Sequence, residues 1–133
     1  MVRVLVNGAF DVLHSGHIEL INYAKSLGDH LTIAVDSDNR IRYSKGNERP
    51  FNSLETRKLI LKNLRAVDEV LDFDSNNELR TIIDSCEIRV IGSDWKGKTI
   101  VGEDLCEIKF FERVNDESTT KTLENYINRR KLL

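Results

Sequence analysis

Short apolar runs alternate with amphipathic segments along this chain of 133 residues, and that alternation limits the fold it can adopt. Runs rich in branched and aromatic side chains predict five strands, at residues 2–6, 31–35, 67–73, 88–91 and 108–111. Helical periodicity and capping residues predict helices at 17–27, 52–64 and 75–86, and a last helix that begins at Asp116 or Ser118 and ends near residue 129. Apolar strands that alternate with helices predict an α/β fold with a parallel sheet covered on both faces.

The polar segments that follow the strands are where ligands are expected. Residues 36–52 contain Gly46 and Pro50 and are predicted to form a long loop, and residues 93–106 to be mostly loop with at most one helical turn. In an open parallel sheet, ligands bind outside the carboxyl ends of the strands, where the strand order reverses. We therefore seek functional residues in five segments: 7–17, 36–52, 74–76, 92–106 and 112–118.

Composition excludes several classes of function. The chain has 20 Lys+Arg against 22 Asp+Glu, so it lacks the basic excess expected of a protein that binds nucleic acid or a membrane surface. No apolar run approaches the roughly 18 residues of a membrane span, and without a targeting segment we expect a cytoplasmic protein. Cys86 and Cys106 stand far apart, which favours reduced packing residues over a zinc site. The length predicts a single domain, residues 1–133.

The segment after the first predicted strand carries two histidines three residues apart, His14 and His17, around Gly16 at the start of a helix. The unpaired N–H groups of a helix N-terminus attract anions, and imidazoles beside them can donate hydrogen bonds to phosphoryl oxygens. A plain packing or capping role is the alternative for both rings, and a zinc site would need further ligands that His30 does not supply. The G-x-G-x-x-G and G-x-x-x-x-G-K-[ST] patterns are absent, so this is neither an ordinary NAD-binding chain nor a Walker-type NTPase.

The full stretch G-x-F-D-x-x-H-x-G-H runs from Gly8 to His17, and further blocks follow it in order. Arg49-Pro50-x-Asn52 precedes the second predicted helix, Gly92-x-Asp94-Trp95 follows the fourth strand, and Ser118-Thr119-Thr120 opens the last helix. With these blocks the chain resembles the nucleotidylyltransferase superfamily that carries the H-x-G-H signature, in its small cytidylyltransferase-like branch. The resemblance implies a Rossmann-like three-layer α/β/α domain with a five-stranded parallel sheet.

The resemblance also implies a reaction, in which a phosphate monoester attacks the α-phosphorus of a nucleoside triphosphate and pyrophosphate leaves. Four residues are implied in catalysis: His14, His17, Lys45 and Arg113. Nucleotide binding is implied for Ala9, Phe10, Gly16, Asp94, Ser118 and Thr119. Acceptor binding is implied for Asp11, Lys45, Arg65 and Trp95. The expected cofactor is Mg²⁺, held mainly by the triphosphate, no protein metal site is expected, and relatives of this kind imply a homodimer.

Each of these assignments has a plainer alternative. A solvated loop lysine would explain Lys45, a turn would explain Asp94, helix solubility would explain Arg65, and an N-cap would explain Ser118. Asp11 is expected to orient other groups and not to act as a base.

Two substrate pairs remain open. The Asp94–Lys98 block, Arg113 and the compact length favour CTP with a small phosphate monoester such as glycerol 3-phosphate. Asn7-Gly8, Lys45-Gly46 and Arg49-Pro50 favour ATP with a sugar phosphate such as heptose 1-phosphate. We expect CTP, and the further alternative is a nucleotide-binding module without catalysis.

Overall fold

The computed structural model describes residues 1–112 and 124–128. Its strands are β1 (Arg3–Gly8), β2 (His30–Asp36), β3 (Glu69–Phe73), β4 (Ile88–Gly92) and β5 (Glu107–Phe111). Its helices are α1 (Ser15–Ser26), α2 (Asp38–Lys45), α3 (Leu54–Lys62) and α4 (Asn76–Asp84), with a 3-10 turn η1 (Ser93–Trp95) and a helical segment at residues 124–128. All five predicted strands are present, and every strand pair is parallel.

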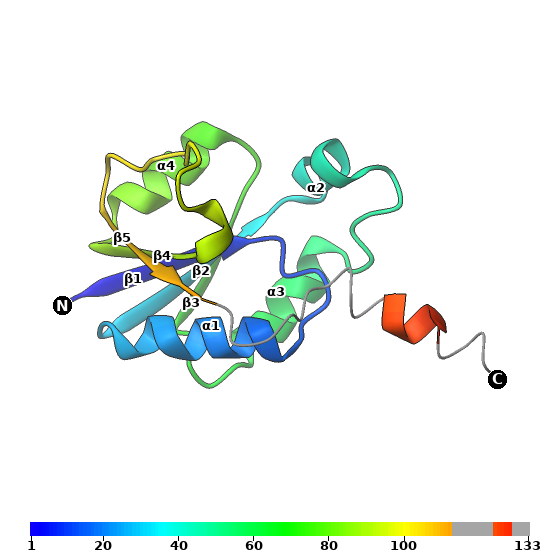
Figure 1. Cartoon of the computed structure of the whole chain (residues 1–133), viewed down its shortest axis with the longest axis horizontal. Coiled ribbons are helices and arrows are strands. Elements are labelled where there is room, and N and C mark those ends of the chain that lie inside the picture. The colour runs from blue at the N-terminus through cyan, green and yellow to red at the C-terminus, as the bar shows by residue number, and fades with distance from the viewer. Residues whose placement is uncertain (113–123, 129–133) are drawn as a thin grey trace.

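The predicted three-layer arrangement is confirmed, because helices cover both faces of the sheet (Figure 1). On one face, Ile21 and Ala24 of α1 and Leu61 of α3 belong to the same buried cluster as Val4 and Val6 of β1. On the other face, α4 contributes a second buried cluster, made up of Leu5, Ala34, Phe73, Leu79, Ile83 and Cys86. Successive residues of β1 therefore point to opposite layers, as the period of two in a strand requires.

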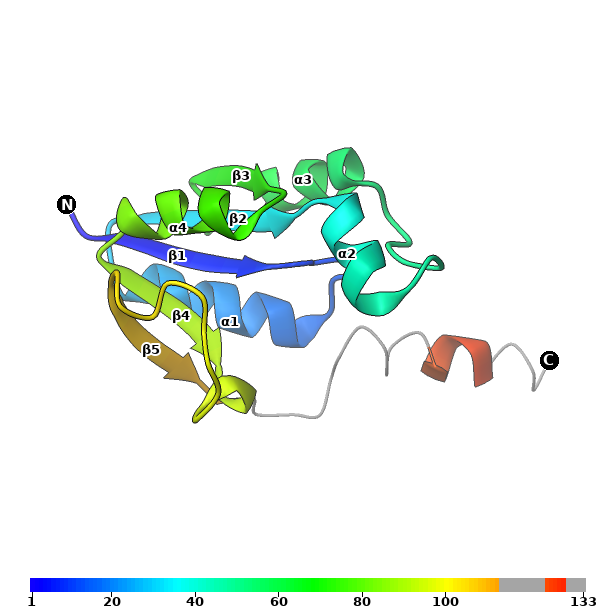
Figure 2. The same cartoon turned by 90° about the horizontal axis from the view of Figure 1, so that it is seen from above.

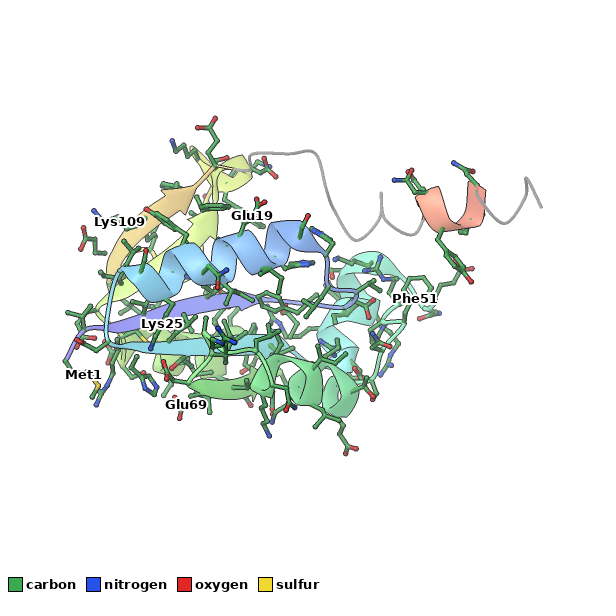
Figure 3. The ribbon with its side chains drawn as sticks, turned by 90° about the horizontal axis from the view of Figure 1, so that it is seen from below. Met1, Glu19, Lys25, Phe51, Glu69 and Lys109 are labelled. Carbon is green, nitrogen blue, oxygen red and sulfur yellow. The ribbon has the colours of Figure 1, made fainter. Side chains whose placement is uncertain are left out.

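The strand order is β3-β2-β1-β4-β5, so the order reverses between β1 and β4. The segment after β1 turns into α1 on one face, and the segment after β4 turns into η1 (Figure 2). The helix α2 lies beyond the carboxyl ends of the strands, and Phe51 lies at the opposite end of the molecule from Met1 (Figures 2 and 3). The described parts of the functional segments predicted from the sequence thus lie at the carboxyl ends of the strands.

The prediction that residues 36–52 form a loop is wrong for half of the segment, because Asp38–Lys45 is helical. The Ser37 hydroxyl caps this helix by accepting the Arg40 N–H, and Ile41 is its buried residue. A helix with one apolar anchor has no hydrophobic periodicity to detect, which is why the sequence pattern missed it. It ends at Gly46, whose φ of 99° lies in the left-handed region that glycine adopts at helix ends.

The predicted start of α3 is off by one residue. Asn52 was expected to cap the helix with Glu55, but Ser53 is the cap and accepts the Thr56 N–H. The Asn52 side chain instead donates to the main-chain oxygen of Asp11. At α4 the predicted cap is confirmed, since Ser75 accepts the Glu78 N–H. The predicted start of the last helix, at Asp116 or Ser118, lies outside the described residues.

Candidate active site

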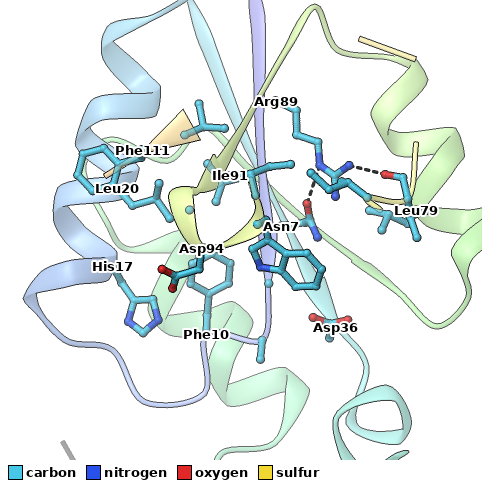
Figure 4. Close-up of a pocket in the computed structure, with 18 of the residues that line it drawn as sticks. Asn7, Phe10, His17, Leu20, Asp36, Leu79, Arg89, Ile91, Asp94 and Phe111 are labelled. Atoms are coloured by element: carbon cyan, nitrogen blue, oxygen red, sulfur yellow. Dashed lines mark hydrogen bonds between the residues drawn. The ribbon is translucent and has the colours of Figure 1, made fainter. Parts of the chain in front are cut away.

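A cavity of about 640 Å³ opens at the carboxyl ends of β1 and β4 (Figure 4). Its walls come from the segment between β1 and α1, from α2, from β4 with η1, and from residues 99–101. Eight of the residues singled out in the sequence line it: Ala9, Phe10, His14, Gly16, His17, Lys45, Asp94 and Trp95. The cavity therefore lies where an open parallel sheet with this strand order is expected to bind its ligand.

Phe10 shapes the turn from β1 into α1. Its φ of 50° lies in the left-handed region, which is unusual for a bulky residue, and its side chain is nonetheless buried. The Phe10 ring lies against Gly8, where a Cβ would come within 3.3 Å of Phe10 Cε2. The same ring lies 5.5 Å from the His17 ring, centroid to centroid. The packing of Phe10 thus fixes the path of the chain just before the two histidines.

The two histidines of the motif form the N-terminal cap of α1. Gly16 N–H donates to His14 Nδ1 at 3.1 Å, and His14 N–H donates to His17 Nδ1 at 3.2 Å. The two rings are tilted by 36°, with their centroids 4.0 Å apart. A neutral imidazole that accepts a hydrogen bond at Nδ1 carries its hydrogen on Nε2. Both rings are therefore fixed as Nε2–H donors at the wall of the cavity.

Asp11 is buried beneath the cavity and holds residues 49–52 against the motif. Its Oδ2 accepts from Arg49 Nε at 2.8 Å and from the Phe51 N–H at 2.9 Å, and its Oδ1 accepts from the Asn52 N–H at 2.9 Å. Burial alone would raise the pKa of Asp11, but the Asn52, Phe51 and Arg49 hydrogen bonds together hold that pKa below its ordinary value. The carboxylate stays ionised and positions other groups, which is the orienting role expected of it.

Arg57 joins three segments around the cavity, although its side chain is fully buried. Its guanidinium donates to the main-chain oxygens of Ala9 and Asp36, both at 2.8 Å, and to that of Asn52 at 3.0 Å. It also forms an ion pair with Asp38 at 2.6 Å. One side chain of α3 therefore ties the segment after β1 to the start of α2 and to residues 49–52.

Lys45 ends α2 at the cavity, with its side chain exposed. Partial desolvation and the nearby positive charge of Arg49 lower the pKa of Lys45, and the charges of Asp11 and Asp36 partly offset this. No residue in the described ranges forms an ion pair with its ammonium group. A cation in this position can bind a phosphate oxygen without first breaking an existing pair.

Asp94 and Trp95 both line the cavity and belong to η1, which directly follows β4. Figure 4 labels Asp94 there. Trp95 is 51% exposed, and Lys98 Nζ lies 5.7 Å from its ring centroid. An indole that is half in contact with protein and half open to a cavity is suited to stacking on a planar ligand.

Arg65 does not line the cavity. Arg65 is exposed and follows α3 before β3 begins, so it lies toward the amino ends of the strands, away from the cavity. Arg113, Ser118 and Thr119 lie outside the described residues.

Arg89 lines the cavity but was not predicted from the sequence, and Asn7, which the sequence offered only as part of the Asn7-Gly8 block, lines it as well. Arg89 is only 4% exposed, and its Nε donates to Asn7 Oδ1 at 3.0 Å. A signal was present in the sequence, because Arg89 is a charged residue inside the otherwise apolar strand Ile88–Ile91. Charged residues seldom occupy such positions unless they are paired or functional.

The acidic residues of the cavity do not form a metal cage. Within residues 1–112 and 124–128, no group of three His, Cys, Asp or Glu side chains is arranged to hold a metal ion. Asp36 and Asp94 both line the cavity, and Asp36 accepts from Arg40 at 2.9 Å. This donor set fits a Mg²⁺ ion that arrives on triphosphate oxygens and keeps its water ligands.

The fold is that of a Rossmann-like α/β protein, and the cavity has the position and the donors of a phosphate-binding site. The chain belongs to the cytidylyltransferase-like family: the sequence model described as "Cytidylyltransferase-like" matches residues 5–127. The resemblance inferred from the Gly8–His17 motif is therefore confirmed.

Two named relatives are similar over most of the chain. The glycerol-3-phosphate cytidylyltransferase of Bacillus subtilis is 40% identical over 93% of this chain and 96% of its own length. A "Bifunctional protein HldE" from Wolinella succinogenes is 41% identical over 91% of this chain. The chain spans about a quarter of the length of that HldE protein, of which 26% is covered.

A solved structure shares this fold. The lipopolysaccharide core biosynthesis protein from Thermoplasma volcanium superposes with a TM-score of 0.67 at 25% identity, covering 88% of this chain and 99% of that one.

Asn in place of Asp11 should destabilise the fold by about 3 kcal/mol at pH 7, because the amide leaves Arg49 without its carboxylate and turns an N–H toward a buried donor. The pKa of Asp11 is lowered in the folded state, so the ionised carboxylate stabilises the fold above the unfolded pKa of about 4. That contribution disappears as the pH falls through the lower folded value. The free energy of unfolding is measured with urea for the unaltered protein and for Asp11→Asn, at pH 7 and near pH 3. The difference between the two proteins should be smaller near pH 3 than at pH 7.

The matched control is Asp72→Asn, which removes an exposed carboxylate that pairs with Lys58 at 2.6 Å. It should cost less than about 1 kcal/mol, because solvent screens an exposed pair. Equal costs for the two variants at pH 7 would contradict the anchoring role of Asp11.

Proposed function

We propose that this chain transfers a nucleotidyl group from a nucleoside triphosphate to a small phosphate monoester and releases pyrophosphate. The favoured pair is CTP with glycerol 3-phosphate. One observation carries the proposal: both imidazoles of the motif accept a backbone N–H at Nδ1, which fixes the orientation of both rings at the N-terminus of α1, on the wall of the cavity. Donors that are held before the ligand arrives need no reorganisation during the reaction.

In the proposed reaction, an oxygen of the acceptor phosphate attacks the α-phosphorus and forms a new P–O bond. The bond from the α-phosphorus to the bridging oxygen breaks in line with it, and its electron pair leaves with pyrophosphate. The acceptor is already an anion near neutral pH, so the reaction needs charge stabilisation and alignment more than a strong base. His14 and His17 donate to the phosphate chain, and Lys45, at the end of α2, supplies a mobile positive charge.

The Asp94–Lys98 block supports CTP. The glycerol-3-phosphate cytidylyltransferase named above is 40% identical to this chain over 93% of it. The alternative pair is ATP with a sugar phosphate such as the heptose 1-phosphate of ADP-heptose synthesis. It is favoured by Asn7 and by the Lys45-Gly46 and Arg49-Pro50 blocks.

Further proposals concern the cofactor, the assembly and the location. Mg²⁺ bound to the triphosphate would neutralise charge on the transferring and leaving phosphates. A homodimer is proposed from the family resemblance, and a monomer mass by light scattering at micromolar concentration would exclude it. The cytoplasm is proposed because nucleoside triphosphates are available there. In the described residues no helix is long and apolar enough to cross a membrane.

The proposal is tested by measuring pyrophosphate release from CTP, ATP, UTP and GTP, each with glycerol 3-phosphate, heptose 1-phosphate and phosphocholine. We expect the highest kcat/KM for CTP with glycerol 3-phosphate. A preference for ATP with heptose 1-phosphate would select the alternative enzyme. Saturable nucleotide binding with no pyrophosphate in any combination would instead identify a nucleotide-binding module.

Replacing His17 by Ala should lower kcat by at least about 10²-fold, because it removes a donor that acts on developing charge. The matched control is His30→Ala. His30 stands at the start of β2, where its Nε2 lies 3.6 Å from Glu69 Oε1, and its loss should leave kcat unchanged. Circular dichroism establishes that both variants are folded. A His17→Ala enzyme with near-normal kcat would contradict the assigned role.

Removal of Mg²⁺ should abolish turnover, because the triphosphate then carries its full negative charge into the cavity. Pyrophosphate release is measured with excess EDTA and again after Mg²⁺ is restored, and turnover should return. The metal should bind the apoenzyme only weakly by calorimetry, because no cage of protein ligands was found in the described residues. Full activity in EDTA would refute this dependence.

A further inference from the structure

Arg89 carries a buried charge that the described residues do not neutralise. The residue is 4% exposed, yet no carboxylate in the described ranges forms an ion pair with it. Its Nε donates to Asn7 Oδ1 at 3.0 Å, and its Nη1 donates to the main-chain oxygen of Val101 at 2.5 Å. A guanidinium has five N–H groups, so two of them are satisfied by these contacts.

Keeping such a charge inside the fold is unfavourable. Desolvation lowers the pKa of Arg89, which means that burial works against its charged form. A well-packed apolar side chain in place of a buried charge is often as stable or more stable. Packing within the strand therefore does not explain an arginine at this position. We expect the explanation in a ligand that binds in the cavity.

Arg89 lies on the α4 side of the sheet. It pairs in register with Leu5, which belongs to the cluster packed against α4. Together with Asn7, Leu79 and Val101 it forms one wall of the cavity, which we call the α4-side wall. His17 begins the helix on the other face, and Figure 4 shows Arg89 and His17 on opposite sides of β1.

In-line displacement assigns the two sides of β1 to different substrates. The attacking oxygen must approach the α-phosphorus from the side opposite to the leaving pyrophosphate. If the phosphate chain lies along the end of α1, where His14 and His17 donate, the acceptor enters from the α4 side. The charge of Arg89 then faces the acceptor and not the nucleotide.

We propose that Arg89, held by Asn7 and Val101, is the specificity-determining residue that binds an anionic oxygen group of the acceptor. This inference rests on the proposed function. The group is either the phosphate that attacks or a second anionic group, such as a carboxylate, at the other end of the acceptor. A guanidinium suits both, because its fork of N–H groups matches the oxygens of phosphate and of carboxylate.

The test compares two acceptors that share a skeleton, glycerol 3-phosphate and 3-phosphoglycerate, in which a carboxylate replaces the terminal hydroxymethyl group. Arg89→Met keeps the length of the side chain without its charge, and Arg89→Lys keeps the charge without the fork. Arg80→Met is the matched control: this arginine of α4 is 43% exposed, lies outside the cavity and is 3.6 Å from Asp104.

We expect Arg89→Met to raise the KM for the acceptor about 10- to 100-fold, the effect of losing a charge-assisted hydrogen bond, with the KM for CTP within about twofold. The KM of Arg89→Lys for the acceptor should lie between those of Arg89→Met and the unaltered enzyme. The KM of Arg80→Met should equal that of the unaltered enzyme. Equal increases for both acceptors identify the attacking phosphate as the bound group. An increase in KM for 3-phosphoglycerate alone identifies a second anionic group.

An unchanged KM for both acceptors in the Met and Lys variants would overturn the inference, and so would a change confined to CTP. If Arg89→Met does not fold, the Lys variant decides by the same criteria. Calorimetric binding of the two acceptors separates this inference from the proposed function. Binding that depends on Arg89 in a protein without turnover would refute the function and support the inference. Binding that is absent, or equal in Arg89→Met, would refute the inference.

Discussion

The cavity depends on one buried guanidinium. Arg57 takes part in four hydrogen bonds, with the main-chain oxygens of Ala9, Asp36 and Asn52 and with the Asp38 carboxylate. These acceptors belong to three segments that are far apart in sequence. Loops of this kind are ordered at a cost in conformational entropy, and a fixed fork of donors offsets that cost at several points at once. Asp11 adds a second tie between two of the same segments.

The histidines connect this framework to the chemistry. Each uses Nδ1 to satisfy a backbone N–H where α1 begins, so the ring that completes the helix is the ring that faces the cavity. Orientation and tautomer are then properties of the fold and do not depend on a bound ligand. A capping role and a phosphate-binding role, which are alternatives when the sequence is considered alone, are compatible because they use different nitrogens of one ring.

The limits of prediction from the sequence follow from the range of the interactions concerned. The strands were predictable because buried parallel strands are apolar along their length, and the site was located because the Gly8–His17 motif directly follows the first of them. The helix α2 was missed because Ile41 is its single apolar anchor. Asn52 was mistaken for a cap because its actual partner, Asp11, lies 41 positions away, and capping rules consider only neighbours.

Two buried arginines in one small domain show how a structural role can be told from a ligand-binding role. Arg57 donates to four acceptors, and one of them is a carboxylate, so its charge and its geometry are both satisfied within the chain. Arg89 is buried almost as deeply but has two acceptors, neither of them charged. Folding alone would favour an apolar residue at this position, as at its strand neighbours Ile88 and Val90. Burial alone does not distinguish the two arginines, because both are buried. The number and charge of their acceptors do, and this difference supports the proposal that Arg89 binds an anion.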